Sequence, residues 1–190
     1  DERRTNDDGT FVNETFLSSL GLPEFVRFLD GTRLPLIEDV IHMTGEKQGI
    51  PVEIAMIYND SFSENVHSYV NNINTHEGGT HLSGFKTALT KAINDYAKRN
   101  NLLKKADTQI SGDDVREGLT AIISVRIPNP QFEGQTKMKL GNSEVQGIVN
   151  SLVYEGLQTH FEENPTMANR IVNKSLDAAR AREAARKARD

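Results

Sequence analysis

The stretch LTAIISVRI, which runs from Leu119 to Ile127, decides the fold class of this chain. It is rich in β-branched residues, and its apolar side chains fall on both faces around Ile122 and Ile123. A strand that is apolar on both faces is covered on both sides, so this stretch is predicted to be a central strand of a sheet.

Two further stretches are predicted to join this sheet. The residues from Pro51 to Tyr58 place apolar side chains at alternate positions, which is the pattern of a strand with a buried face. The turn-forming residues Asn59 to Ser61 follow, so the stretch from Val66 to Ile73 is expected to return as the partner strand of a hairpin.

Helical periodicity marks the stretches that cover the sheet. Apolar residues from Leu82 to Tyr96 share one face of a long amphipathic helix. The residues from Ser143 to Gln146 have the pattern of a capping box, which starts another helix toward Phe161. A short helix is expected from Leu17 to a stop near Gly31. This order of elements predicts an α/β or α+β sandwich with helices on one sheet face.

The last helix is predicted to begin at Pro165, with Asn164 as its N-cap. Its apolar stripe is thin and ends in alanines, so we expect a rigid arm that leaves the globular part. Residues 170–190 contain seven basic and three acidic side chains, and since the whole chain carries −5, the preceding part carries −9. The arm is either a solvated helix or a helix that contacts nucleic acid or an acidic partner.

The composition excludes several classes of protein. Of the 190 residues, 36% are hydrophobic and 26% are charged, as in folded domains. The absence of cysteine excludes disulfides, thiolate metal sites and cysteine nucleophiles. No apolar run is long enough to span a bilayer, and no signal sequence opens the chain. We therefore expect a cytoplasmic location, no membrane partner, and a piece of a longer protein, since the initiating Met is missing.

The motif HEGGTH, from His76 to His81, resembles a zinc-protease motif only superficially. That motif needs its second histidine four residues after the first, where Thr80 stands here. Adjacent glycines are also poor in a helix interior. We expect no metal site, and a glycine loop followed by Thr80 as the N-cap of the long helix.

An acidic cluster precedes the central strand. Asp113 and Asp114, with Arg116 nearby, are suited to acid–base work or to Mg²⁺ binding. The structural interpretation, a capped helical turn with an arginine partner, is favoured. No phosphate-binding motif of the GxxxxGK[ST] or GxGxxG type is present, and no Ser/His/Asp order stands out. The chain is therefore not expected to be a complete enzyme.

Two features are suited to phosphate. The second face of the long helix carries Lys86 and Lys91, which either contact phosphates or simply face solvent. The stretch from Pro128 to Lys139 is a long polar loop, of the kind that often carries function. Within it, Lys137 offers a mobile cation, and Gln135 offers both a donor and an acceptor.

This loop, QFEGQTKMKLGNSEV from Gln131 to Val145, resembles the QTK loop of the B-subunit family of bacterial type II topoisomerases. That family includes DNA gyrase and topoisomerase IV, and the likeness is closer to the gyrase branch. Three other stretches agree with the family in the same order: Asn71–Ile73 with His76–Gly84, Gly112–Leu119, and Ala178–Arg186.

The resemblance implies a transducer domain at residues 1–163 and a C-terminal helix at residues 164–190 that leads toward the TOPRIM domain. It implies an α+β split β-α-β sandwich with a left-handed crossover, a mixed sheet with helices on one face, and a long C-terminal helical arm. In the family, the glutamine and lysine of the loop contact the γ-phosphate of ATP in the neighbouring ATPase domain, and the matching residues are Gln135 and Lys137. Lys86 stands where the family usually has an arginine that lines its DNA cavity, and Lys91 is a second candidate.

The same resemblance implies the wider setting. The full-length protein is expected to use ATP and Mg²⁺ in DNA supercoiling, with none bound to this piece, which is expected to be inactive alone. The expected partners are DNA, the gyrase A subunit, a second gyrase B chain, and the chain's own ATPase and TOPRIM domains. The alternatives are the same domain of topoisomerase IV, a standalone nucleic-acid-binding module and, most distantly, a zinc hydrolase.

Overall fold

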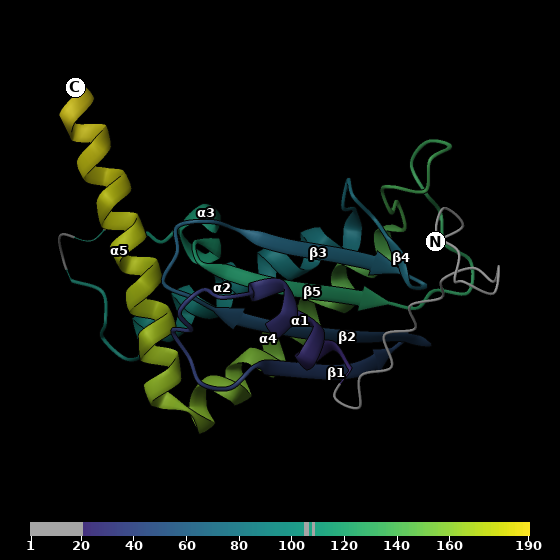
Figure 1. The fold of residues 1–190 in the computed structure, drawn as a ribbon, viewed down its shortest axis with the longest axis horizontal. Helices are drawn as coiled ribbons and strands as arrows, with labels where there is room; N and C mark the ends of the chain where they lie inside the picture. Colours follow the sequence, from purple (N-terminus) through teal and green to yellow (C-terminus); the bar gives the residue numbers. More distant parts are fainter. Residues whose placement is uncertain (1–20, 105–106, 108) are drawn as a thin grey trace, which may run out of the picture.

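A computed structural model describes residues 21–104, 107 and 109–190, and these form one mixed sheet with helices packed on it (Figure 1). The strand order is β1-β2-β5-β3-β4. In chain order the elements are α1 (Leu22–Asp30), β1 (Ile41–Lys47), β2 (Ile50–Tyr58), β3 (Asn65–Val70), β4 (Ile73–Asn74), α2 (Thr80–Arg99), α3 (Gly112–Arg116), β5 (Leu119–Val125), α4 (Ser143–Glu163) and α5 (Pro165–Arg189).

The central position of β5 is confirmed. It pairs antiparallel with β2 on one side and parallel with β3 on the other. Ile122 and Ile123 are both fully buried, because helices cover one face of the sheet and α1 covers part of the other. The parallel pair β3 and β5 is joined through α2 and α3, which is the β-α-β unit expected of this α+β fold.

The predicted hairpin between residues 51–58 and 66–73 is wrong. β2 forms its hairpin with β1, through a two-residue turn in which Gln48 and Gly49 have φ of 54° and 73°. Two positive φ values are what a tight hairpin turn requires. β3 cannot pair with β2, because β5 lies between them and uses the hydrogen-bonding edges of both strands. The chain after Asn59 therefore passes the end of β5, where the Asn59 N–H donates to the Gly118 carbonyl at 2.8 Å.

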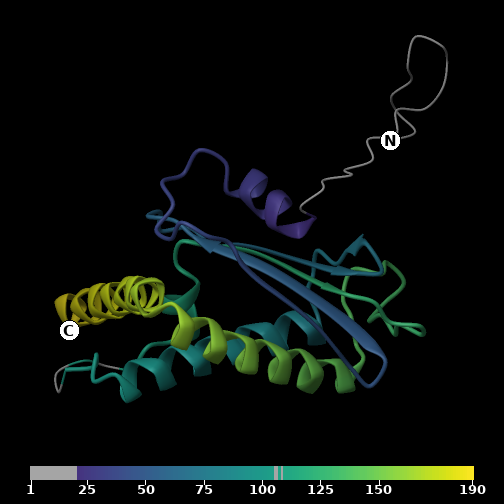
Figure 2. The same ribbon diagram turned by 90° about the horizontal axis from the view of Figure 1, so that it is seen from below.

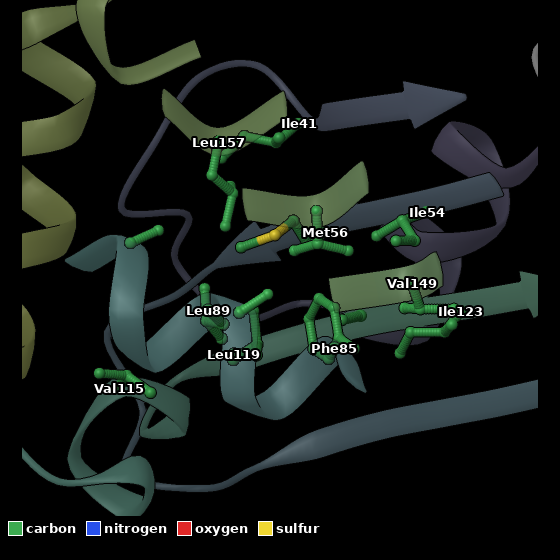
Figure 3. Packing of buried hydrophobic residues seen from close by; sticks show 14 of the residues in the cluster. Ile41, Ile54, Met56, Phe85, Leu89, Val115, Leu119, Ile123, Val149 and Leu157 are labelled. Carbon is green, nitrogen blue, oxygen red and sulfur yellow. The ribbon is translucent and has the colours of Figure 1, made fainter. Parts of the chain in front are cut away.

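The long helices α2 and α4 lie side by side on one face of the sheet, whereas the short α1 lies on the opposite face (Figure 2). Phe85 and Leu89 of α2 and Leu157 of α4 point into the core, toward Met56 of β2 and Ile123 of β5 (Figure 3). These side chains are at most 1% exposed. The core therefore fixes α2 and α4 relative to the sheet.

Helix starts differ in detail from the prediction. Gly79 and Asn142 occupy the N-cap positions of α2 and α4, so Thr80 and Ser143 are first helical residues and the capping box at Ser143 is absent. The capping box of this fold is at α3 instead, between Ser111 and Asp114. The helix predicted to stop near Gly31 is confirmed as α1, and its expected start at Leu17 lies outside the described residues.

The arm α5 begins at Pro165 as predicted, but its first half is packed rather than free. Ile171, Val172 and Leu176 are buried, and the helix becomes exposed from Arg180 onward. Figure 1 shows α5 at one end of the sheet and the loop between β5 and α4 at the other end. None of the helices in the described part of the chain is long and apolar enough to cross a membrane.

Candidate functional site

The loop between β5 and α4 is a narrow hairpin with a clamped stem. Its two legs meet through backbone bonds, from the Glu133 N–H to the Lys139 carbonyl at 2.8 Å and from the Gly141 N–H to the Gln131 carbonyl at 2.7 Å. The side chains of Glu133 and Lys139 form an ion pair at 3.0 Å across the stem. The hydrogen bond to Glu133 raises the pKa of Lys139. The ammonium group of Lys139 is therefore already paired within the loop.

The tip of this loop, residues 134–138, carries both residues that the sequence singled out. Gln135 and Lys137 are exposed, and Gly134 and Lys137 turn the chain with φ of 80° and 55°. Within the described part of the chain, neither Gln135 nor Lys137 makes a side-chain hydrogen bond or an ion pair. The tip therefore presents one cation and one amide to a partner outside this part of the chain.

The base of the loop is held by Asn142, a residue that the sequence patterns did not indicate. Asn142 is 4% exposed, and its side-chain oxygen accepts a hydrogen bond from the Gln131 N–H at 2.6 Å. Its amide group donates to the Asn129 carbonyl at 3.4 Å. Its place directly before the α4 helix was the available signal, since Asn can bond to loop backbone as well as cap a helix.

The glycine turn at residues 77–80 and the loop form one structure, although they are separate features of the sequence. Leu140 pairs with Phe132 on one side and with Gly79 on the other. The Leu140 N–H donates to the Gly78 carbonyl at 3.0 Å, and the Thr80 N–H donates to the Leu140 carbonyl at 3.1 Å. The loop therefore docks against the N-terminus of α2.

The histidines of that turn are not arranged for metal. His81 is fully buried and bonds through Nε2 to Thr75 Oγ1 at 3.0 Å, whereas His76 is exposed before the turn. Burial lowers the pKa of His81 to about 4, which keeps it neutral at pH 7. Among the residues that the structure describes, no group of three His, Asp or Glu is placed to hold a metal ion.

The second candidate face lies on α2, away from the loop. Lys86, Lys91, Lys98 and Arg116 line a surface hollow, together with one carboxylate, Asp95. No loop residue lines this hollow, so the four sequence-predicted residues form two separate places rather than one site. Its summed charge favours an anion such as a backbone phosphate.

Two lysines of this face, Lys86 and Lys91, already have partners. Lys86 Nζ lies 3.8 Å from a carboxylate oxygen of Glu64, which also accepts a hydrogen bond from Arg116 Nε at 2.8 Å. Lys91 Nζ lies 4.7 Å from the centre of the Tyr154 ring, a cation–π contact. Glu64 could not be found from the sequence pattern, because it lies directly before β3 and is distant from α2 in the chain.

The acidic cluster before β5 has the structural role that the sequence favoured. Asp114 is 4% exposed, caps α3 through its bond to the Ser111 N–H at 2.8 Å, and accepts two bonds from Arg182 of α5. Burial raises the pKa of Asp114, but the bonds from Arg182 and Ser111 outweigh it, so the net shift is downward. The cluster therefore anchors α5.

Asp107 makes a matching contact with α5, two residues earlier on that helix. Arg180 donates to both carboxylate oxygens of Asp107, at 2.9 and 3.0 Å. The bond from Arg180, with that from the Lys104 N–H, lowers the pKa of Asp107 to about 2. Two bidentate arginine–carboxylate pairs thus set the direction in which α5 leaves the domain.

Comparison with known proteins identifies the family of this chain. Residues 21–190 match the sequence model of the family described as DNA gyrase B. The B subunit of DNA gyrase from Eisenibacter elegans is 55% identical over 190 residues, which are all of this chain and 40% of that protein. The corresponding protein of Halalkalibacterium halodurans is 59% identical over 170 residues, or 90% of this chain and 27% of that protein. The chain thus spans less than half the length of these relatives.

Solved structures of related proteins superpose on this chain. The 43K ATPase domain of Thermus thermophilus gyrase B, in complex with an aminocoumarin, superposes with a TM-score of 0.85 at 42% identity, over 92% of this chain and 47% of that one. The topoisomerase IV ATP-binding domain of Francisella tularensis gives 0.73 at 30% identity, over 85% and 43%.

Proposed function

This chain belongs to the DNA gyrase B family, and from that membership we propose that it is the transducer domain of an ATP-dependent type II DNA topoisomerase. The domain comprises residues 1–163, and the helix at residues 164–190 leads toward the TOPRIM domain. It senses the state of a nucleotide bound in the neighbouring ATPase domain and relays that state to the DNA gates. It works with DNA, the gyrase A subunit, a second gyrase B chain and its own ATPase and TOPRIM domains.

The assignment to the transducer, rather than to the nucleotide-binding part, is supported by what the chain lacks. It has no glycine-rich phosphate-binding motif. It covers 47% of the solved 43K ATPase domain of gyrase B, so that structure has ample chain to hold the nucleotide elsewhere. ATP and Mg²⁺ are therefore held mainly by the rest of the full-length protein.

The observation that carries the proposal is the Lys137 cation at the loop tip, which has no ion-pair partner among the residues that the structure describes. The Lys137 ammonium and the Gln135 amide are donors that fit the oxygens of a terminal phosphate. ATP supplies that terminal phosphate, with its negative charge. Lys137 gains a charge partner only while the phosphate is present, so its contact distinguishes two nucleotide states.

The position of the tip suits a relay. The loop lies at one end of the sheet and α5 at the other, with the α2 and α4 pair between them in Figure 2. Since α2 and α4 are fixed on the sheet by a buried core, a displacement of the tip moves the domain as one body. The arm α5, anchored through Asp107 and Asp114, carries that movement onward.

The α2 face is the proposed DNA contact. Lys86 and Lys91 line the cationic hollow and neutralise phosphates without reading sequence. A lysine at position 86 keeps the charge of an arginine but not its two-pronged geometry, so its phosphate contact is a point-charge contact.

The test replaces one lysine of the loop at a time in the full-length protein, assembled with the gyrase A subunit. Lys137→Met keeps the apolar part of the side chain and removes its charge. We expect ATP turnover and supercoiling to fall roughly 100-fold, the usual effect of losing one organised donor. Lys139→Met is the matched control, because Lys139 is paired with Glu133, and roughly twofold at most is expected. Equal effects of the two substitutions would contradict the proposal.

We propose the gyrase branch rather than topoisomerase IV, because the relatives at 55% and 59% identity are gyrase B subunits. Negative supercoiling of relaxed plasmid by the assembled enzyme tests this choice, because a topoisomerase IV enzyme only relaxes or decatenates. The 190-residue chain alone is expected to hydrolyse no ATP. Turnover by the purified chain would show that the assignment is wrong.

A further inference from the structure

We infer that the turn at residues 77–80 is the joint that couples the loop tip to α2, and that the Thr80 N–H is its positioning group. This inference rests on the proposed function, since it says how a signal received at the tip enters the domain. It adds a role for the Gly78–Gly79 pair, whose sequence motif pointed only superficially to zinc.

The joint consists of three backbone hydrogen bonds between the turn and the returning leg of the loop. The Glu77 N–H donates to the Met138 carbonyl at 2.9 Å, the Leu140 N–H to the Gly78 carbonyl at 3.0 Å, and the Thr80 N–H to the Leu140 carbonyl at 3.1 Å. Met138 is the last residue of the tip, one position after Lys137. The joint therefore begins next to the proposed phosphate contact.

Leu140 is the centre of the joint. Its backbone pairs with Phe132 of the opposite leg and with Gly79 of the turn, and its side chain is fully buried. A displacement of the returning leg is thus passed sideways into the turn as well as along the chain toward Asn142. Buried backbone groups keep such bonds, because breaking one leaves a donor or acceptor unsatisfied.

Glycine at position 79 is required by this close approach. Gly79 has φ of 133°, and a Cβ there would overlap the backbone nitrogen and oxygen of Leu140. The turn therefore cannot carry a side chain at this position and keep the joint closed. The same glycine is the N-cap residue of α2, so the joint leads directly into the helix.

The receiving side of the joint is rigid. Gly84, in the second turn of α2, lies so close to α4 that a Cβ would overlap the Gln146 carbonyl oxygen. Lys86 of the cationic hollow follows two residues later, roughly 9 Å of helix rise from Thr80. A movement that enters at Thr80 therefore reaches the lysine face and the α2–α4 pair together.

The test removes one bond of the joint and leaves the helix start intact. Thr80 is the first residue of α2, a position where proline is tolerated because its N–H has no partner inside the helix. Thr80→Pro therefore removes the bond to the Leu140 carbonyl without breaking α2. Ser143→Pro is the matched control, since Ser143 is the exposed first residue of α4 on the other side of the loop. Among the described residues, its N–H makes no backbone bond outside its helix.

The readout, on the assembled full-length enzyme, is the number of DNA strand passages per ATP hydrolysed. For Thr80→Pro we expect ATP turnover within roughly twofold of the parent and a ratio that is lower by roughly fivefold, the equilibrium effect of one hydrogen bond. For Ser143→Pro both values stay near those of the parent. Gly79→Ala, which opens the same joint by overlap with Leu140, should lower the ratio in the same way and replaces Thr80→Pro if that variant does not fold.

The outcomes separate this inference from the proposed function. A normal ratio in Thr80→Pro overturns the joint, and so does a fall in ATP turnover that leaves the ratio unchanged, since the turn would then only support the tip. Normal ATP turnover in Lys137→Met overturns the phosphate contact instead. A second readout is hydrogen exchange in residues 82–88. A non-hydrolysable ATP analogue should slow it in the parent and in Ser143→Pro but not in Thr80→Pro, and slowing in all three overturns the joint.

Discussion

The loop tip at residues 134–138 and helix α2 both offer lysines to phosphate, yet they hold those charges in opposite ways. Lys137 is exposed and makes no ion pair within the described residues. On α2, Lys86 lies beside Glu64 and Lys91 lies over Tyr154, while the opposite side of the helix is buried against α4 and the sheet. A charge without a local partner responds to a ligand that comes and goes, whereas a charge that is already partnered gives a steady, weaker field.

The largest difference between the two regions is expected in stability. Gly84→Ala places a methyl group against the Gln146 carbonyl and should lower the free energy of unfolding by about 3 kcal/mol, because two packed helices must separate. Gly147→Ala is the control: it is a helical glycine at an exposed position of α4, with nothing within 4 Å of a Cβ, and alanine there should add about 0.5–1 kcal/mol. Urea unfolding of the 190-residue chain measures both. A neutral Gly84→Ala would mean that α2 and α4 slide freely.

A second contrast concerns pH. Burial lowers the pKa of His81 from 6.5 to about 4. Between pH 6.5 and pH 4, His81 therefore binds a proton in the unfolded chain but stays neutral in the folded protein. Stability is therefore fully present above pH 6.5 and falls as the pH falls, by about 2 kcal/mol at pH 5. His67, whose pKa is lowered by burial and by His76, acts in the same direction.

Urea unfolding between pH 7 and pH 4 measures this dependence. His81→Asn should remove most of the slope. An unchanged slope in His81→Asn would show that the fold does not lower the pKa of this histidine. Substitutions at the tip, such as Lys137→Met, should not change the slope.

The smallest expected effect would make the α2 face resemble the tip. Glu64→Gln removes the carboxylate beside Lys86, whereas Arg116 keeps its ion pair with Asp113 at 2.7 Å. The freed Lys86 should strengthen duplex DNA binding by the full-length protein roughly two- to threefold at low salt. Glu155→Gln, which frees Lys47 on the other side of the domain, should leave affinity unchanged. Fluorescence anisotropy over a salt series measures both. Equal gains would indicate that only net charge matters.

Much of the fold of this domain can be predicted from its sequence. Strand β5, helix α2, the start of α5 at Pro165 and the exposed, turn-rich character of the loop all follow from patterns within short windows. The predicted hairpin partner of β2 is wrong, because turn residues after Tyr58 indicate a reversal but not which strand fills the neighbouring edge. The Gln48–Gly49 turn is the stronger local signal for the hairpin that forms.

The candidate site divides in the same way. Lys137 and Gln135 can be found because a cation and an amide in a polar loop are visible in the letters, and Lys86 and Lys91 because they share a helix face. Glu64 cannot, since it acts on residues that the chain brings near only after folding, and the only sequence signal for Asn142 is its place directly before α4.

The local amino-acid sequence thus specified which segments become helices and strands and which side chains can offer charge to a phosphate. These properties depend on neighbours only a few residues away. Only the fold determined that the glycine turn and the loop both bond to Leu140 and that Glu64 pairs with Lys86. It also determined that Asp107 and Asp114 hold α5. These contacts join residues separated by about 20 to 75 positions, and only the packing of sheet and helices selects one set of such pairs from the many that the same letters permit.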